Sequence, residues 1–130
     1  SNKNKKYINY YTKNIINTMS TTIIDSAKTS FLKGGFNTRK ARCYKLNDII
    51  SKTKFKSRKI DFLNIDTEKS EVDVLKSLNF NKYRPSLICI EIHLKKKNYL
   101  KFHPTYLYLK RKKYKIIWRK GISFIFSSRL

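Results

Sequence analysis

Acidic residues and glycine are both scarce in this sequence. Its 130 residues include 8 Asp+Glu against 31 Lys+Arg, which gives a formal net charge of +23 at pH 7. The three glycines (Gly34, Gly35 and Gly121) form no G-x-G run of the kind that holds a cofactor against the start of a helix. The sequence therefore contains no glycine-rich cofactor loop.

Cysteine and long hydrophobic runs are also rare. Cys43 and Cys89 stand alone, without C-x-x-C spacing, so we expect two free, buried thiols in a reducing, cytoplasmic setting. No apolar run approaches the roughly 18 residues that a membrane helix needs, and the first residues lack the apolar core of a signal peptide. These features favour a globular domain without a membrane span.

The excess of lysine has two interpretations. A strongly basic chain is typical of proteins that bind nucleic acid. However, Lys, Asn, Ile, Tyr and Phe, all with A/T-rich codons, make up roughly half of the chain, so the base composition of a genome accounts for part of the charge. Because any such polycation binds phosphates at low salt, we expect weak, nonspecific binding to polyanions.

The first 40 residues are predicted to form a helical N-terminal segment. Apolar residues recur at helical spacing over residues 5–18 and again before Gly34-Gly35, which would end a second helix. The alternating stretch "ARCYKL" (41–46) predicts a short strand, followed by a short helix that Asn47 would cap. Residues 41–130 are then expected to form a separate α/β region.

The second half of the chain alternates between strand and helix patterns. The order predicts an α/β sheet that is parallel at first and has an antiparallel hairpin at its C-terminal end, turning at Gly121. "SLICIEI" is almost continuously apolar, which is typical of a strand covered on both faces. The expected elements are strand 60–65, helix 71–80, strand 86–92, a helix that starts at Pro104, and the hairpin strands 114–118 and 122–127.

Polar side chains follow the ends of the first two of these strands. Asp66 and Glu68 come just after strand 60–65, and Glu91 and His93 end strand 86–92. Ligands of open α/β sheets bind beyond the carboxyl ends of the strands, so we expect these four groups to converge on one edge. Because strand side chains alternate, Glu91 and His93 share one side with Cys89.

Two further acids, Glu71 and Asp73, open the predicted helix 71–80. The helix dipole favours acidic residues in a first turn, which gives both a structural interpretation.

Four blocks of the sequence resemble the C-terminal half of FkbM-type S-adenosylmethionine-dependent methyltransferases. The family pattern is a strand followed by D-x-E-G-x-E and a V-L-x-G-L helix. Asp66, Glu68 and Glu71 match its three acids, whereas Lys69 stands where the family has glycine. The resemblance covers about residues 41–127, through "KLNDII", "IDFLNIDTEKSEVDVLKSL", "RPSLICIEIH" and "YKIIWRKGISFIF".

This resemblance implies a partial class I methyltransferase (Rossmann-like) sheet. The chain would supply its fourth strand onward, without the N-terminal half that holds most of the cofactor, S-adenosylmethionine. Asp66 and Glu68 would border the cofactor. Glu91 and His93 would be the catalytic candidates beside a small-molecule or glycan acceptor, whose hydroxyl group is methylated. As such a fragment, the chain would be inactive by itself.

Two alternatives stay open at this stage. "KKKNYLKFHPTYLYLKRKKYKIIWRK" interleaves basic and aromatic residues, as a nucleic-acid-binding module would. A metal-dependent nuclease or hydrolase could use Asp66, Glu91 and His93, although no tight ligand spacing such as H-x-x-x-H supports a metal site.

Overall fold

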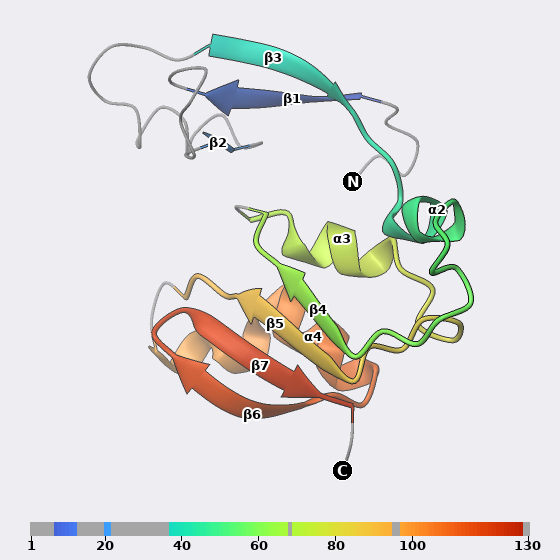
Figure 1. The fold of residues 1–130 in the computed structure, drawn as a ribbon. Coiled ribbons are helices and arrows are strands. Elements are labelled where there is room, and N and C mark those ends of the chain that lie inside the picture. The colour runs from blue at the N-terminus through green and yellow to red at the C-terminus, as the bar shows by residue number, and fades with distance from the viewer. Residues whose placement is uncertain (1–6, 13–19, 22–36, 68, 95–96, 129–130) are drawn as a thin grey trace. The chain divides into compact units, whose positions relative to one another are not determined.

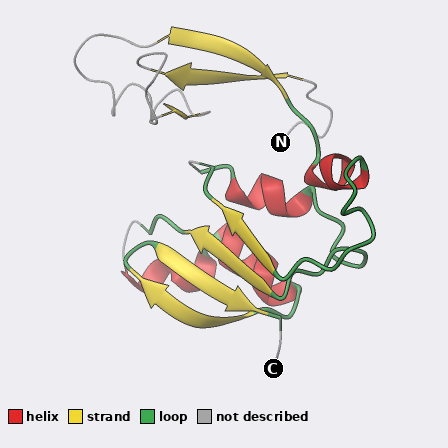
Figure 2. Ribbon diagram, in the orientation of Figure 1, coloured by secondary structure: helices red, strands yellow, loops and turns green. Residues whose placement is uncertain are grey.

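The computed structural model describes residues 7–12, 20–21, 37–67, 69–94 and 97–128. These residues belong to two compact units. The first unit lies within residues 1–44 and 67–70, and the second within residues 45–66 and 71–130. Figures 1 and 2 show the elements of both.

The first unit contains a small antiparallel sheet with the order β2-β1-β3. Its strands are β1 (Tyr7–Thr12), β2 (Ser20–Thr21) and β3 (Asn37–Arg42). The predicted helix over 5–18 is therefore wrong at residues 7–12, where the run YINYYT favours a strand through its aromatic and β-branched residues. The strand predicted at 41–46 instead ends at Arg42. Residues 13–19 and 22–36, and with them the second predicted helix, lie outside the described residues.

The second unit follows the predicted alternation of strands and helices. Helix 71–80 is shorter than predicted and ends at Lys76, whereas Pro104 begins its helix as expected. The elements are α2 (Leu46–Ser51), β4 (Phe62–Ile65), α3 (Glu71–Lys76), β5 (Leu87–Glu91), the 3-10 helix η1 (Lys97–Phe102), α4 (Pro104–Arg111), β6 (Lys115–Lys120) and β7 (Ser123–Ser127).

The second unit's four strands form one sheet with the order β4-β5-β7-β6 (Figure 1). β4 and β5 are parallel neighbours, and β6 and β7 form an antiparallel hairpin with Gly121 in the turn at φ +58°. These pairings confirm the predicted α/β sheet with its C-terminal hairpin. The hairpin folds back so that β7, not β6, pairs with β5 in antiparallel fashion, which makes the sheet mixed.

The core lies on one face of this sheet. Ile88 and Ile90 of β5 are buried together with Phe124 and Phe126 of β7, and Leu75 of α3 joins them. Helix α4 packs beside α3, and the Tyr108 hydroxyl donates to the Leu75 carbonyl at 3.4 Å.

The other face of the sheet is only partly covered. Leu87, Cys89 and Glu91 of β5 are half-buried, as is Ile125 of the neighbouring β7. The expectation that strand 86–92 is buried on both faces is therefore wrong. Cys43 and Cys89 are free thiols, as predicted, but both are half-buried rather than buried.

The N-terminus of α2 shows how a distant residue replaces a local cap. Lys45, not Asn47 as predicted, occupies the N-cap position, and its side chain makes no capping bond. Ser77 supplies the acceptors instead, because its hydroxyl accepts from the Leu46 amide at 3.0 Å and its carbonyl from the Asn47 amide at 3.2 Å. No helix in the described parts of the chain is long and apolar enough to cross a membrane.

Candidate functional site

The ends of β4 and β5 bring two predicted site residues to the same edge of the sheet. Ile65 pairs with Ile90, so Asp66 and Glu91, each one residue further on, lie at the same level of neighbouring parallel strands. Asp66 is exposed and Glu91 is partly buried. We call the carboxyl ends of β4 and β5, with the residues around them, the acidic edge.

His93 contacts Glu91 at this edge. Its Nε2 lies 3.7 Å from Glu91 Oε2, and the two side chains are 41% and 31% exposed. This distance is too long for a hydrogen bond and short enough for an ion pair when the imidazole is protonated. The pairing agrees with the expectation that Glu91 and His93 share one side of the strand.

His103 lies near both His93 and a further acid, Glu71. Glu71, the first residue of α3, is only 5% exposed, and His103 is the N-cap of α4, where Nδ1 accepts from the Thr105 amide at 3.3 Å. Burial lowers the pKa of His103 below its ordinary value; the Glu71 carboxylate opposes this shift and His93 adds to it. The acidic edge therefore also includes Glu71 and His103.

Sequence reasoning missed the part that these two residues play. Glu71 lies in the first turn of α3, as the sequence predicts, but no sequence pattern indicates that it is buried. His103 directly precedes Pro104, a residue that favours the first helical position, and this spacing could have identified the imidazole as an N-cap.

Folding stability is expected to fall as the pH drops below 6.5, the ordinary pKa of His103. Because the folded state lowers this pKa, the unfolded chain binds the proton first, and acid then favours unfolding until the pH passes the folded pKa. Urea unfolding between about pH 7.5 and 5.5 measures the slope. His103→Asn keeps a capping oxygen without a titrating ring, so its slope should be smaller. Equal slopes in the two proteins would contradict this prediction.

The turn between β4 and α3 contains the position where the family has glycine. Lys69 adopts φ +77°, in the left-handed region that glycine occupies without strain. Residue 69 thus has the backbone conformation typical of glycine, although it is a lysine. Glu68, the other predicted residue of this turn, lies outside the described residues.

Lys69→Gly is expected to be more stable than Lys69→Ala by about 1 kcal/mol, because only glycine relieves the left-handed backbone. Both changes remove the same lysine side chain, so their difference isolates the backbone effect. Thermal unfolding followed by circular dichroism measures it. Equal stability of the two variants would show that residue 69 does not hold a positive φ.

The acidic edge combines the groups needed for proton transfer at an exposed position. A carboxylate with an adjacent imidazole can accept a proton from a substrate hydroxyl group, and Asp66 can accept hydrogen bonds from a ligand. No three His, Cys, Asp or Glu side chains within the described ranges are placed to hold a metal ion, and Asp66, Glu91 and His93 accordingly form no such group.

Comparison with known proteins identifies the family. The model of the methyltransferase FkbM domain matches residues 2–116, which extends the resemblance toward the N-terminus to include β1 and β3. No curated protein and no solved structure gave a significant match. The match includes all of the acidic edge, Asp66, Glu71, Glu91, His93 and His103. The chain belongs to the FkbM methyltransferase domain family.

Proposed function

We propose that the protein transfers a methyl group from S-adenosylmethionine to a hydroxyl group of a sugar or another small natural product. The observation that carries this proposal is the acidic edge. Asp66 directly follows one parallel strand, and the Glu91–His93 pair lies at the same end of the neighbouring strand, in a chain of this family. Open α/β sheets bind their ligands at this edge.

The residues of the acidic edge suit the cofactor. S-adenosylmethionine, when bound, supplies an electrophilic methyl group on a positively charged sulfur. It also carries an amino group and ribose hydroxyl groups, which donate hydrogen bonds that the exposed Asp66 carboxylate can accept. The sequence contains no G-x-G run, so the described residues would form one wall of the cofactor pocket.

Glu91 is the residue that we assign as the general base. As the acceptor oxygen bonds to the methyl carbon, its proton must leave, and the partly exposed Glu91 carboxylate can take it. His93, at 3.7 Å, positions this carboxylate and stabilises its charge when the imidazole is protonated. His103 Nδ1 accepts a hydrogen bond from the Thr105 amide. The neutral imidazole therefore carries its proton on Nε2, which can donate a hydrogen bond to the oxygen of the methyl acceptor.

Transfer of a labelled methyl group tests the proposed function. The full-length protein, as the cell makes it, is incubated with methyl-labelled S-adenosylmethionine and matched acceptors that carry a hydroxyl, an amino or a carboxyl group. We expect label on the hydroxyl acceptors alone. Label on amines alone would contradict hydroxyl methylation, and the absence of both cofactor binding and transfer would contradict the proposed activity.

A further inference from the structure

Two basic pockets lie together in the second unit, at the edge where β4 and β5 begin. They share Arg84 and Ser128, so they are parts of one groove, which we call the basic groove. The first pocket has a volume of about 530 Å³ and is lined by Lys56, Ser57, Arg58, Lys59, Lys82, Tyr83, Arg84, Ser86 and Ser128. The second has a volume of about 660 Å³ and adds Tyr106, Lys110, Lys113, Tyr114, Lys115 and Ile116.

The charge of the basic groove is of one sign. Its lining contains eight lysines and arginines and no aspartate or glutamate. In the first pocket five of nine residues are cationic, compared with 31 of 130 in the whole chain. The general excess of lysine therefore does not account for this concentration. Clustered cations repel one another, and an anion bound among them relieves that repulsion.

Arg84, at the junction of the two pockets, is held in place by the protein. Its Nη2 donates to the Lys112 carbonyl at 2.9 Å, and its guanidinium lies 5.2 Å from the centre of the Tyr114 ring. Tyr114 is itself fixed, because its hydroxyl donates to the Pro85 carbonyl at 2.5 Å. Since a guanidinium has five N–H donors, others are left for a bound oxyanion.

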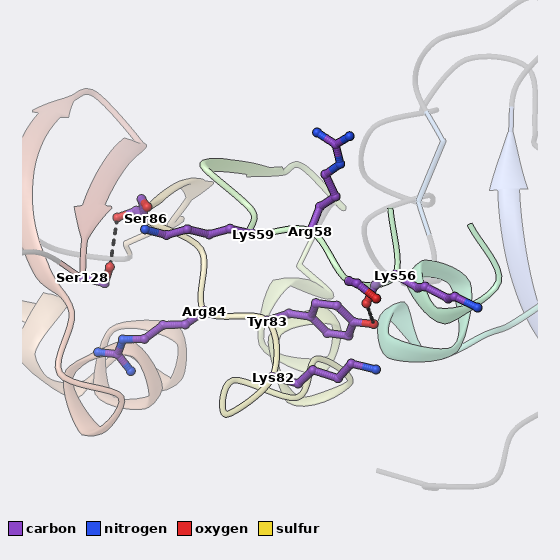
Figure 3. Close-up of a pocket in the computed structure, with 9 residues that line it drawn as sticks. Lys56, Arg58, Lys59, Lys82, Tyr83, Arg84, Ser86 and Ser128 are labelled. Carbon is purple, nitrogen blue, oxygen red and sulfur yellow. Dashed lines mark hydrogen bonds between the residues drawn. The ribbon is translucent and has the colours of Figure 1, made fainter. Parts of the chain in front are cut away.

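The walls of the first pocket are tied together by hydrogen bonds (Figure 3). The Tyr83 hydroxyl donates to the Lys56 carbonyl at 2.8 Å, and the Ser128 amide and hydroxyl donate to the Ser86 carbonyl at 3.0 and 3.3 Å. In Figure 3 the Lys59 side chain runs toward Ser86, while Arg58 points away from it. Arg84, Ser86 and Ser128 are therefore held in place, and the exposed Lys59 side chain extends beside them.

The basic groove is separate from the acidic edge. The first pocket lies before β4 and β5 and after β7, and the second adds residues of α4 and the start of β6, which pairs with the end of β7. Asp66 and Glu91 lie at the opposite ends of the two parallel strands. β4 has four residues, and a strand of that length spans about 13 Å. A ligand in the basic groove would therefore not be the methyl acceptor, and its binding would not depend on methyl transfer.

We propose that the basic groove binds the phosphodiester backbone of a single-stranded nucleic acid. Two joined pockets can take successive phosphates, one near Lys59 and Arg84 and the next near Lys113 and Lys115. A hollow groove lined in part by serines fits a strand of nucleic acid better than it fits the flat surface of a membrane. Tyr83 and Tyr114 are buried and Tyr106 is half-buried, so the groove presents little aromatic surface on which bases could stack. The protein would therefore recognise phosphates, without sequence preference.

Variants that each lack two positive charges test this proposal. Fluorescence anisotropy with a thymidine oligonucleotide of about 12 nucleotides is measured between roughly 50 and 200 mM salt. The pocket variant is Arg84→Gln with Lys59→Gln. The control, Lys76→Gln with Lys101→Gln, removes the same charge from exposed lysines that line neither pocket. Because Arg84 contacts Tyr114, thermal unfolding checks the fold, and Lys59→Gln with Lys115→Gln serves as a second pocket variant.

The pocket variants should bind the oligonucleotide about tenfold more weakly than the wild type, and the control about twofold at most. The slope of log affinity against log salt should fall by about 0.7 for each pocket cation removed. Equal losses in pocket variant and control would overturn the proposal, since net charge alone would then explain binding. So would preferential binding to phosphatidylserine vesicles, or displacement of the oligonucleotide by low millimolar inorganic phosphate, which would indicate a membrane or a small phosphorylated ligand.

Discussion

Replacement of Glu91 by glutamine is expected to lower kcat for methyl transfer by a factor of about 10² to 10⁴, with little change in the KM for the acceptor. The amide keeps the size of the side chain and its place at the end of β5, but it cannot take a proton from the acceptor hydroxyl group. The loss therefore falls on the chemical step. Initial rates of label transfer by the full-length protein measure it.

Two variants show whether this loss is specific to Glu91. Asp73→Asn removes a carboxylate from the exposed side of α3 and should leave kcat unchanged. His93→Gln should lower kcat less than Glu91→Gln, because His93 acts through the carboxylate 3.7 Å away. If Glu91→Gln changes kcat no more than Asp73→Asn does, Glu91 is not the base.

Replacement of Leu75 by alanine is expected to destabilise the second unit by about 3 kcal/mol. Leu75 is fully buried where α3 packs on the sheet, among the core residues of β5 and β7. Truncation leaves a cavity that the surrounding strands fill only in part. Urea unfolding is followed through the fluorescence of Trp118, the one tryptophan in the sequence, which lies on β6 of the same unit.

Leu107→Ala on α4 provides the matched control for this prediction. Leu107 is half-buried, so the same change of side chain removes less apolar surface from the core and should cost about half as much. Equal costs at the two positions, or a larger cost at Leu107, would contradict the placement of the core on this face of the sheet.

The second unit was largely predictable because its signals are local. The apolar run of β5, the acids at the start of α3, Pro104 and Gly121 each mark an element within a few residues. β1 was not predictable in this way. Its apolar residues fit a helical spacing as well as a strand, and its partner, β3, lies far along the chain, with Ile8 opposite Ala41.

The strand residues of the candidate site could be predicted, because their positions follow from the order of the strands. The residues on helices could not, because their positions depend on how the helices pack. Asp66 and Glu91 lie at one edge because parallel neighbouring strands end there, which the alternation of strands and helices already indicated. Glu71 and His103 are brought near each other by the packing of α3 beside α4, which no local pattern shows. The positive φ at Lys69 is consistent with the glycine of the family pattern.

The affinity of the full-length protein for S-adenosylmethionine, compared between Asp66→Asn and Asp61→Asn, tests the central claim most directly. Both changes remove one exposed carboxylate, but Asp66 follows β4 at the acidic edge and Asp61 precedes it at the opposite end. Calorimetry should show a Kd about tenfold weaker for Asp66→Asn, through the loss of a charge-assisted hydrogen bond, and no change for Asp61→Asn. An unchanged Kd in Asp66→Asn, or equal weakening in both, would contradict a cofactor site at the acidic edge.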